Sequence, residues 1–377
     1  MDFVLYFRSR QGEMVQLLKE LVNRESPTQD KKAVDACLAF LTEEFRKIGC
    51  RLKRFPQKQV GDFYLVQFGE KPKNKVQLRP VLILTHIDTV WPVGQLKQMP
   101  FFISGDKIYG PGTLDMKAGL VMAFAAVKAL ADLNLPCRRP VLIFINSAEE
   151  TGNKEAHDVI LKLARKVDFV LCLEPALPGG GLKTERKGRL VVRLEAYGKA
   201  AHAGTPEKGA SAVEELIGQL RKLKQIRRGG ITANIGLIGG GEKANIVAEK
   251  AWSVVDLRFW SNAQKEKIWR FFRDLKPLFP GTKLKFWQES LTPPLEKTPA
   301  SVQFFHQVKS IAEGMGIMLR EGKTGGGSDA SIAASVGVAT LDGLGPDGDG
   351  IHAKNEHLLL PSLVERTALL TEILRVL

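Results

Sequence analysis

The 377-residue sequence predicts an α/β protein with a central, mostly parallel β-sheet and a smaller α+β unit inserted into it. Short, continuously apolar segments alternate with helical patterns over most of the chain, which is typical of parallel strands covered by helices on both faces. A central region instead alternates apolar and polar residues, as half-exposed strands do. The length is sufficient for two domains, each with its own core.

The elements of the larger domain follow one another as strand and helix. Helical patterns occupy about 13–24 and 31–48, and the first apolar strand is "PVLILTHID". The elements that follow are the helix "MKAGLVMAFAAVKALADLN", the strand "RRPVLIFINSAEE", the helix "KEAHDVILKLARK" and the strand "DFVLCLEP". The chain ends with the short helix "SDASIAASVG", the strand "VATLDGLG" and the helix "PSLVERTALLTEILRVL", whose proline lies in the first turn, where it is tolerated.

The inserted unit is expected over residues 186–294, which leaves 1–185 and 295–377 as one discontinuous domain. Its strands are "GRLVVRLEAYGKAAHAG", "ITANIGLIGGG" and "EKAWSVVDLRFW", and its amphipathic helices are "SAVEELIGQLRKLKQIRR" and "AQKEKIWRFFRDLKPLF". The segment "TPPLEKTP" at 292–299 would be the linker that returns to the larger domain.

The charge of the chain is concentrated in this insert. The whole sequence holds 55 Lys and Arg against 41 Asp and Glu, a net charge of +14. Residues 186–294 hold 21 and 10 of them, so 21 − 10 gives +11 for this segment. Such an excess suits an anionic ligand, a nucleic acid or a solvated face. The sequence has no zinc-finger or RNA-recognition signature and no basic arm with interleaved aromatic residues, so we expect no nucleic-acid partner.

Composition also bears on where the protein works. No apolar run approaches the length of a membrane span, so we expect no membrane association. The N-terminal "MDFVLYFRSRQGEM" lacks the pattern of a secretory signal. The four cysteines show no metal-ligand spacing and are expected to be free thiols in a reducing compartment. The expected location is cytoplasmic, although a secreted protein trimmed of its signal would look the same.

Polar side chains follow three of the predicted apolar strands. His86 and Asp88 come after "VLILT", Glu149 and Glu150 after "VLIFINSA", and Glu174 after "FVLCL". Ligands of open α/β sheets bind outside the carboxyl ends of the strands, so we expect these groups to lie together. Each group alone has a plainer interpretation, such as a surface loop or a solvated carboxylate. The repeated placement favours a common site.

Two further residues extend this set. Asp115 precedes a helix, where it could also serve as the N-cap, and His352 lies in the Gly-rich loop "GDGIHAKN". Histidine and carboxylate ligands without cysteine suit zinc, cobalt or manganese. Two histidines with three or four carboxylates are too many for one tetrahedral zinc ion, but they fit two ions that share a carboxylate. The metals would also offset the repulsion between the adjacent glutamates.

The motifs "HIDT", "GPGTLDMKAG", "SAEETGN", "CLEP", "GKAAHAG", "GGGSDA" and "GIHAKNE" occur in the order seen in a known enzyme family. In these motifs the chain resembles the co-catalytic dinuclear zinc aminoacylases and carboxypeptidases, which include glutamate carboxypeptidase, acetylornithine deacetylase and succinyl-diaminopimelate desuccinylase. The resemblance covers nearly the whole chain and is closest to bacterial glutamate carboxypeptidases. It implies a zinc-peptidase-like α/β domain and a ferredoxin-like insert that acts as a lid and dimerisation domain.

The resemblance assigns roles to the residues of the larger domain. Asp115 would bridge two Zn²⁺ ions per subunit, with Co²⁺ or Mn²⁺ as possible replacements, and the Asp115–Met116 peptide would be cis. Glu149 would be the general base that activates water and later protonates the leaving amine. Asp88 would orient the imidazole of His86. The remaining ligands would be His86 and Glu174 for one ion and Glu150 and His352 for the other.

The resemblance also assigns roles to the insert. His202 would reach across a homodimer to stabilise the oxyanion of the partner's substrate. Arg258 and Asn245 would hold a substrate carboxylate. Gly326 and Gly327 would bring backbone close to the substrate. The chain departs from the family pattern in reading "NIVA" rather than "NVIP" after the asparagine, and "MKAG" rather than "MKGG" after the bridging aspartate.

The function implied is metal-dependent hydrolysis of an amide bond next to a free carboxylate. A carboxypeptidase that releases a C-terminal glutamate or similar residue from a small, acidic peptide or N-acyl amino acid is the first expectation. An N-acyl-amino-acid deacylase of the deacetylase or desuccinylase type is the alternative, because the same metals and base serve both reactions. An inactive homologue that binds ligands is the third, and the complete ligand set argues against it.

Overall fold

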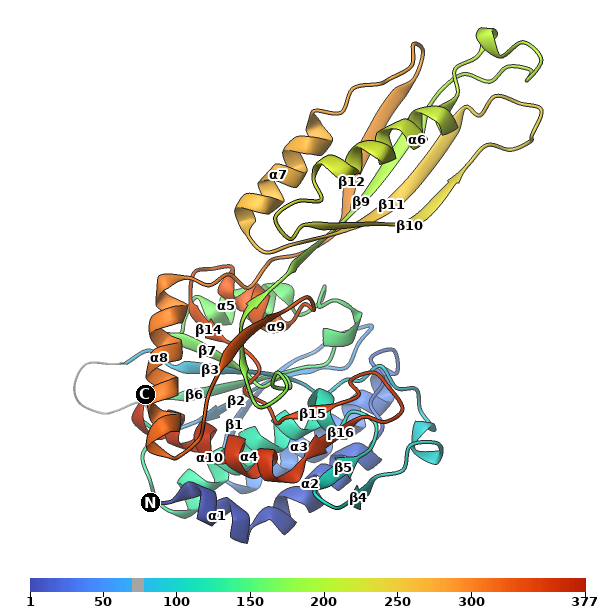
Figure 1. Ribbon diagram of the computed structural model, residues 1–377. Coiled ribbons are helices and arrows are strands. Elements are labelled where there is room, and N and C mark those ends of the chain that lie inside the picture. Colours follow the sequence, from blue (N-terminus) through green and yellow to red (C-terminus); the bar gives the residue numbers. More distant parts are fainter. Residues whose placement is uncertain (70–77) are drawn as a thin grey trace. The chain divides into compact units, whose positions relative to one another are not determined.

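The computed structural model describes residues 1–69 and 78–377, and the chain forms two compact units (Figure 1). Unit 1 consists of Met1–Thr184, Lys297–Lys323 and Ser328–Leu377, and unit 2 of Glu185–Glu296 and Thr324–Gly327. The main division lies within two residues of the bounds expected from the sequence. The addition of 324–327 to unit 2 was not foreseen. Arg186 contacts this segment, because its Nη1 donates hydrogen bonds to the carbonyls of Gly326 and Gly327.

The centre of unit 1 is a six-stranded mixed sheet. Its strands, in spatial order, are β1 (Arg51–Phe55), β2 (Phe63–Phe68), β6 (Val141–Asn146), β3 (Val81–His86), β7 (Phe169–Cys172) and β14 (Ala339–Leu341). The last four run parallel to one another, β2 is antiparallel to β6, and β1 is antiparallel to β2. Every residue of β3 is buried, as expected for a central parallel strand covered on both faces. The predicted α/β class with a mostly parallel sheet is confirmed.

Helices cover both faces of this sheet. In Figure 1, α4 and α10 lie on one side of it and α5 and α9 on the other. The main core contains side chains from α1, α2, α3, α4, α8 and α10 together with the sheet. The helices are α1 (Phe3–Ser9), α2 (Gln11–Asn23), α3 (Lys31–Lys47), α4 (Ala118–Asp132), α5 (His157–Ala164), α8 (Pro299–Gly314), α9 (Asp329–Ala334) and α10 (Leu360–Val376). None of the helices among the described residues is long and apolar enough to cross a membrane.

Two small sheets also lie outside the insert. One has the order β15 (Gly348–Asp349), β16 (His357–Leu359), β5 (Lys107–Tyr109) and β4 (Phe102–Ser104). The other pairs β8 (Leu182–Arg186) with β13 (Glu321–Thr324). Because β16 pairs with β5, the loop that carries His352 is held beside the segment that leads to Asp115.

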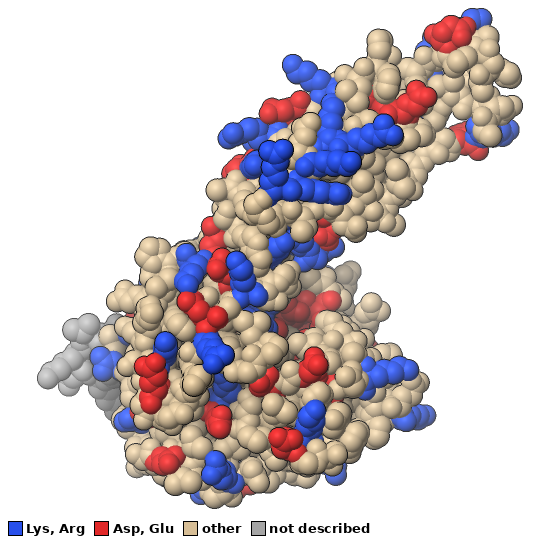
Figure 2. Space-filling view, in the orientation of Figure 1, with Lys and Arg blue, Asp and Glu red and all other residues tan. Residues whose placement is uncertain are grey.

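Unit 2 is a four-stranded antiparallel sheet with two helices. The strands have the order β10 (Thr232–Gly240), β11 (Lys250–Phe259), β9 (Gly188–Tyr197) and β12 (Lys283–Thr292). The helices α6 (Ala212–Lys222) and α7 (Asn262–Arg273) share one core with alternate residues of β9 and β11. The order βαββαβ with β9 and β11 in the centre is the ferredoxin-like arrangement predicted for the insert. Figure 2 shows lysine and arginine side chains gathered over α6 and α7, so much of the basic excess lies on the helical face.

We did not predict β12 from the sequence. Its segment "KLKFWQESLT" alternates only until a register shift between Gln288 and Ser290, which breaks the two-residue period. Most of its residues are exposed because it is an edge strand. An irregular and largely polar edge strand gives little periodic signal.

Candidate metal centre

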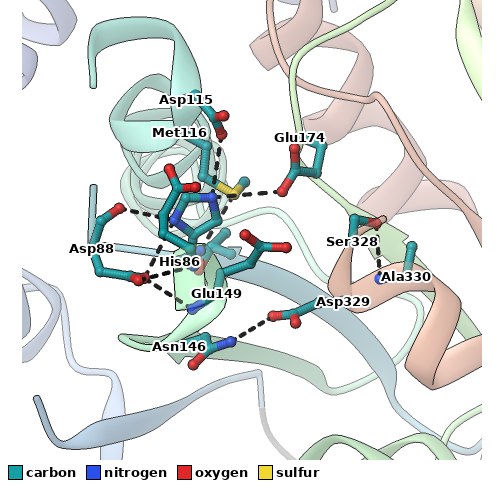
Figure 3. A network of polar contacts seen from close by, with 12 residues as sticks. His86, Asp88, Asp115, Met116, Asn146, Glu149, Glu174, Ser328, Asp329 and Ala330 are labelled. Atoms are coloured by element: carbon teal, nitrogen blue, oxygen red, sulfur yellow. Dashed lines mark hydrogen bonds and ion pairs between the residues drawn. The ribbon is translucent and has the colours of Figure 1, made fainter. Parts of the chain in front are cut away.

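Three adjacent parallel strands end at one edge of the unit 1 sheet and carry the predicted polar groups. His86 is the last residue of β3, and the neighbouring strands β6 and β7 flank it. Glu149 and Glu150 follow β6 in a single 3₁₀ turn, η3 (Glu149–Thr151), and Glu174 lies two residues beyond β7. Figure 3 shows His86, Glu149 and Glu174 converging with Asp115 from the segment before α4.

Asp115 lies between the two histidines and divides its oxygens between them. Its Oδ1 is 3.2 Å from Nε2 of His86, and its Oδ2 is 3.4 Å from Nε2 of His352. Each imidazole therefore faces a different oxygen of one carboxylate. This is the arrangement that a carboxylate bridging two cations requires. The peptide bond between Asp115 and Met116 is cis, as the family resemblance implies.

Each histidine has a second carboxylate beside it. Oε1 of Glu174 is 3.6 Å from Nε2 of His86, and Oε2 of Glu150 is 3.1 Å from Nε2 of His352. Ligand atoms about 2.1 Å from a tetrahedral ion lie about 3.4 Å from one another. The observed separations fit that spacing, and the chemistry of the donors suits a divalent cation. The groups His86–Glu149–Glu174 and His86–Asp115–Glu150 each bring their ligand atoms within 4.8 Å of one another.

The two adjacent glutamates differ in their contacts. Glu150 pairs with His352 through its carboxylate. Within the described ranges 1–69 and 78–377, the carboxylate of Glu149 makes no hydrogen bond or ion pair. It nevertheless approaches the ligand atoms of His86 and Glu174. One glutamate is thus engaged with a histidine, while the other is available for a different task.

The carboxylates hold both histidines in the protonated form in the absence of a metal. Hydrogen bonds with Asp115 and Glu150 raise the pKa of His352 to about 10. Burial disfavours the charged form of His86, but hydrogen bonds with Asp115, Asp88 and Glu174 outweigh burial and raise its pKa well above the usual value. A divalent cation would take over the neutralising role of these protons, because histidine binds metals as the neutral imidazole.

The pKa values of two carboxyl groups are displaced in opposite directions. Burial opposes ionisation of Asp115, but hydrogen bonds with His352 and His86 outweigh it and hold the pKa of this carboxyl below its usual range. Burial, with the charge of Glu174, raises the pKa of Glu149 well above the ordinary value of a glutamate. Groups whose environments move their pKa values apart are typical of acid–base chemistry.

Asp88 connects His86 to the turn that carries the glutamates (Figure 3). Its backbone carbonyl is 3.0 Å and its Oδ1 3.4 Å from Nδ1 of His86. The same carboxylate accepts hydrogen bonds from the backbone N–H groups of Glu149 and Glu150, at 3.3 and 3.2 Å, and from Thr28 Oγ1 at 2.7 Å. The predicted orienting contact with His86 is present, and the contact with the turn is an addition that the sequence did not reveal.

Three buried residues around the site were not among those predicted from the sequence. Glu356 accepts hydrogen bonds from the N–H groups of Gly112, Leu114 and Asp115 and from Trp91 Nε1, and so fixes the segment before Asp115. Asn146 and Asp329 form a second set of contacts beside Glu149 (Figure 3). Glu356 and Asp329 both lie inside the quoted motifs "GIHAKNE" and "GGGSDA", which was the available signal.

Two of the residues assigned to the insert lie together, and a third lies apart from them. The carbonyl of Asn245 accepts a hydrogen bond from the N–H of Ala203, and His202 forms a β-bridge with Ile246. This ribbon joins β11 near its first residue, Lys250. Arg258 lies eight residues further along β11, a distance of about 27 Å in a strand. His202 and Asn245 are therefore at the opposite end of unit 2 from Arg258.

Arg258 is held by an acidic neighbour. Its Nε donates a 2.8 Å hydrogen bond to Asp256, whose other oxygen accepts a 2.6 Å bond from Nε of Arg189. Arg189 is directly opposite Arg258 in the pairing of β9 with β11. Two cations thus share a single carboxylate on the face of the sheet away from the helices. Gly326 and Gly327 are exposed, and Arg186 holds their carbonyls.

The chain matches known proteins in sequence and in fold. Residues 82–376 match the sequence pattern of Peptidase family M20/M25/M40. Carboxypeptidase G2 of Pseudomonas sp. (strain RS-16) is 28% identical over 367 residues, which cover 94% of this chain and 87% of that protein. Succinyl-diaminopimelate desuccinylase of Wolbachia pipientis wMel is 28% identical over 228 residues, which cover 56% of this chain and 53% of that protein.

A solved structure shares the fold. The YXEP protein of Bacillus subtilis, described as a dinuclear metal-binding peptidase of the M20 family, aligns with a TM-score of 0.72 at 12% identity and covers 98% of both chains. The family pattern spans most of the sequence, and the candidate site contains the donors that a metal-dependent hydrolase needs. The chain belongs to peptidase family M20/M25/M40, a family of metal-dependent peptidases and amidohydrolases.

Proposed function

We propose that this protein is a dinuclear zinc carboxypeptidase that hydrolyses the amide bond next to a free carboxylate and releases a C-terminal glutamate or a similar acidic residue. The observation that carries the proposal is the arrangement of Asp115, the two histidines and Glu149 at one sheet edge. Asp115 offers one oxygen to each histidine, and Glu149 remains unengaged beside them. That pattern combines a bridged pair of cation sites with a free base.

In this proposal Asp115 would contribute to both ion sites, and the pair of ligands on either side of it contains no cysteine and would suit zinc. One pair is His86 with Glu174, and the other is His352 with Glu150. When bound, the ions would polarise the amide carbonyl and lower the pKa of water. Cobalt and manganese use similar ligands, so metal content after purification identifies the resident ion.

The protein's own part in the reaction falls to Glu149. Its carboxylate accepts a proton from the attacking water and later donates that proton to the nitrogen of the leaving amine. Burial beside Glu174 raises the pKa of Glu149 well above its usual value, and this supports the role, because a carboxyl with a raised pKa can both accept and return a proton. Asp88 orients the turn, since its carboxylate accepts both backbone N–H groups of Glu149 and Glu150.

An acidic substrate is supported by the two arginines that share Asp256. Nε of each arginine is occupied, and within the described part of the chain the terminal nitrogens of Arg258 and Arg189 make no hydrogen bond. Like charges directly opposite one another on adjacent strands repel, and one carboxylate offsets only one of the two charges. A substrate with two carboxylates would supply the missing negative charge, and guanidinium groups bind carboxylates well.

A homodimer is part of the proposal because the binding residues of unit 2 lie too far apart to serve one substrate. A dipeptide spans at most about 7 Å, whereas Arg258 and the His202–Asn245 ribbon are separated by most of β11. One end can act in its own subunit and the other in the partner. The edge strand β10 offers an interface, because Ile235, Leu237 and Ile238 are 36%, 58% and 58% exposed on it.

The interface can be tested by sedimentation of variants with one new charge. Leu237→Lys should convert the dimer into monomers, because β10 could no longer pair with a second copy. Met318→Lys is the matched control, since Met318 is a 72% exposed apolar side chain in unit 1. A dimer that survives Leu237→Lys unchanged would contradict an interface at β10.

The substrate can be tested by release of amino acid from a panel of N-acyl compounds with zinc-loaded protein. N-acyl-glutamate and N-acyl-glutamine form the decisive pair, since they differ by one charge at nearly constant shape. Turnover that favours glutamate, together with loss of this preference in Arg189→Gln, supports the acidic carboxypeptidase. Turnover confined to N-acetyl or N-succinyl diamino acids would instead identify a deacylase, which the similarity to desuccinylase allows.

A further inference from the structure

One side chain at the end of β6 joins three separate segments beside the proposed base. Oδ1 of Asn146 accepts a 3.0 Å hydrogen bond from the N–H of Ala148. Its Nδ2 donates to Oδ1 of Asn153 and, at 2.9 Å, to Oδ2 of Asp329. Asn146, Asn153 and Asp329 are all buried. We call these three residues the Asn146 clamp.

The clamp closes the turn that carries the two glutamates. Asn146 precedes the turn and Asn153 follows it, so one side chain ties both ends. The backbone N–H of Asn153 also donates to the carbonyl of Ala148 at 3.1 Å. Asn153 has a φ of 61°, in the left-handed region that asparagine tolerates, and this conformation returns the chain toward Ala148. Contacts of Asn146 therefore fix both ends of the turn that carries Glu149 and Glu150.

Asp329 anchors the clamp to another part of unit 1. It is the first residue of α9, and the preceding Ser328 donates a 2.7 Å hydrogen bond to Asp342, just after β14. Ser328 also caps α9 by accepting from the N–H of Ala330 (Figure 3). These hydrogen bonds thus connect the Glu149 turn to β14, an edge strand of the main sheet. The sheet edge and the turn form one hydrogen-bonded unit.

Burial of the Asp329 carboxyl is unfavourable, but this carboxyl restricts the orientation of the Asn146 amide. Asp329 is 2% exposed, and its Oδ1 has no hydrogen-bond partner among the described residues. Burying an acid with one hydrogen bond is unfavourable. Burial raises the pKa of Asp329 to about 7, and once this carboxyl is ionised it can only accept, whereas an amide can present either oxygen or nitrogen to Asn146. Asp329 therefore fixes which way the amide of Asn146 faces, and with it the bond to Ala148.

We propose that Asn146 and Asp329 are positioning residues that hold the Glu149–Glu150 turn in its catalytic orientation. The catalytic part of this inference rests on the proposed role of Glu149. The structural part does not, because the hydrogen bonds can be tested without any substrate. A displacement of a catalytic group by about 1 Å can lower a rate by about 100-fold, so a clamp of this kind has a measurable effect.

The test is an exchange of donor and acceptor between the two residues. Asn146→Asp alone places two carboxyl groups face to face and should disrupt the turn. Adding Asp329→Asn restores a donor–acceptor pair in which residue 329 donates and residue 146 accepts. The amide of Asn153 can rotate so that its nitrogen donates to residue 146. Hydrogen–deuterium exchange of the backbone amides of 147–153 in the metal-free protein reports the turn directly. The single variant should exchange faster than wild type, and the double variant should regain protection.

Turnover at saturating metal supplies the second readout. Asn146→Asp should lower kcat by about 100-fold with KM within about threefold of wild type, and the double variant should recover to within about tenfold. Leu374→Ala near the end of α10 is the stability control: it creates a cavity on the other face of the sheet from α9 and should leave kcat and the protection of 147–153 unchanged. If Asn146→Asp does not fold, Asp329→Ala removes the acceptor without adding charge and should give the same two losses.

The outcomes separate the two proposals. A double variant no better than Asn146→Asp, or single variants whose amides exchange like those of wild type, would overturn the clamp. Altered exchange with unchanged kcat would also overturn its positioning role. If wild type releases no amino acid from any N-acyl compound, the proposed function fails, while the exchange experiment still decides whether the clamp holds the turn.

Discussion

The two units of this protein handle charge in opposite ways. At the sheet edge of unit 1, carboxylates surround two histidines, and hydrogen bonds join groups that come from different segments. On the open sheet face of unit 2, two partly exposed arginines share the single carboxylate of Asp256. The first arrangement brings together the donors that a divalent cation needs. The second has an uncompensated positive charge, which suits contact with a molecule from outside the unit.

The largest expected effect comes from the residue on which the unit 1 arrangement depends. Asp115→Asn should remove the carboxylate proposed to bridge both cation sites, so bound metal should fall from two ions toward none and turnover should be lost. Metal analysis after dialysis measures this directly. Asp256→Asn is the matched change in unit 2 and should keep both ions, with an effect confined to KM. Retention of two ions by Asp115→Asn would break the comparison.

The second prediction tests whether unit 2 serves the partner subunit. His202→Ala and Glu149→Gln should each be nearly inactive alone. When the two variants are mixed and allowed to exchange subunits, half of the dimers would be mixed, and each would contain one complete site. Activity should then return to about a quarter of wild type, as expected for a symmetric dimer with shared sites. A mixture that stays inactive despite subunit exchange would mean that His202 acts in its own subunit.

A smaller effect is expected where charge serves packing rather than chemistry. Glu356→Gln replaces one of the two acceptor oxygens with an NH₂ group, which would then face backbone N–H groups that need an acceptor. This should lower the free energy of unfolding by about 3 kcal/mol. Glu289→Gln in unit 2 is the control and should change it by less than about 0.5 kcal/mol, since its nearest cation is 3.9 Å away and both are partly exposed. Denaturant unfolding of the metal-free proteins measures both.

The pH dependence of metal binding sharpens the comparison further. The pKa of His352 is raised to about 10 and that of His86 is also raised, so both imidazoles carry protons at neutral pH in the metal-free protein. Metal binding must release those protons, so affinity should rise with pH from neutrality until about pH 10. Calorimetry in buffers of different ionisation enthalpy should detect about two protons released. Affinity independent of pH between 6 and 9 would contradict these raised pKa values.

The sequence was most informative where one strand follows another in parallel. The placement of His86, Glu149 and Glu174 after apolar strands predicted their meeting, because parallel strands end at a common edge. Asp115 and His352 were candidates from their positions before a helix and in a Gly-rich loop, but their individual roles needed the family resemblance. Asn146 and Asp329 could not be paired from sequence, because 183 residues separate them and either residue alone reads as a turn or a helix cap. The separation of Arg258 from His202 depends on the length of β11 and on sheet register, which local patterns do not report.

The division of roles between the two adjacent glutamates is the central claim, and paired amide variants test it most directly. Metal content and turnover of Glu149→Gln and Glu150→Gln should be measured side by side. Glu149→Gln should keep two ions and lose turnover by roughly 100- to 10,000-fold, because it lacks the base. Glu150→Gln should lose an ion as well as activity, because it lacks a ligand. Full activity in Glu149→Gln, or an unchanged metal content in Glu150→Gln, would contradict the account.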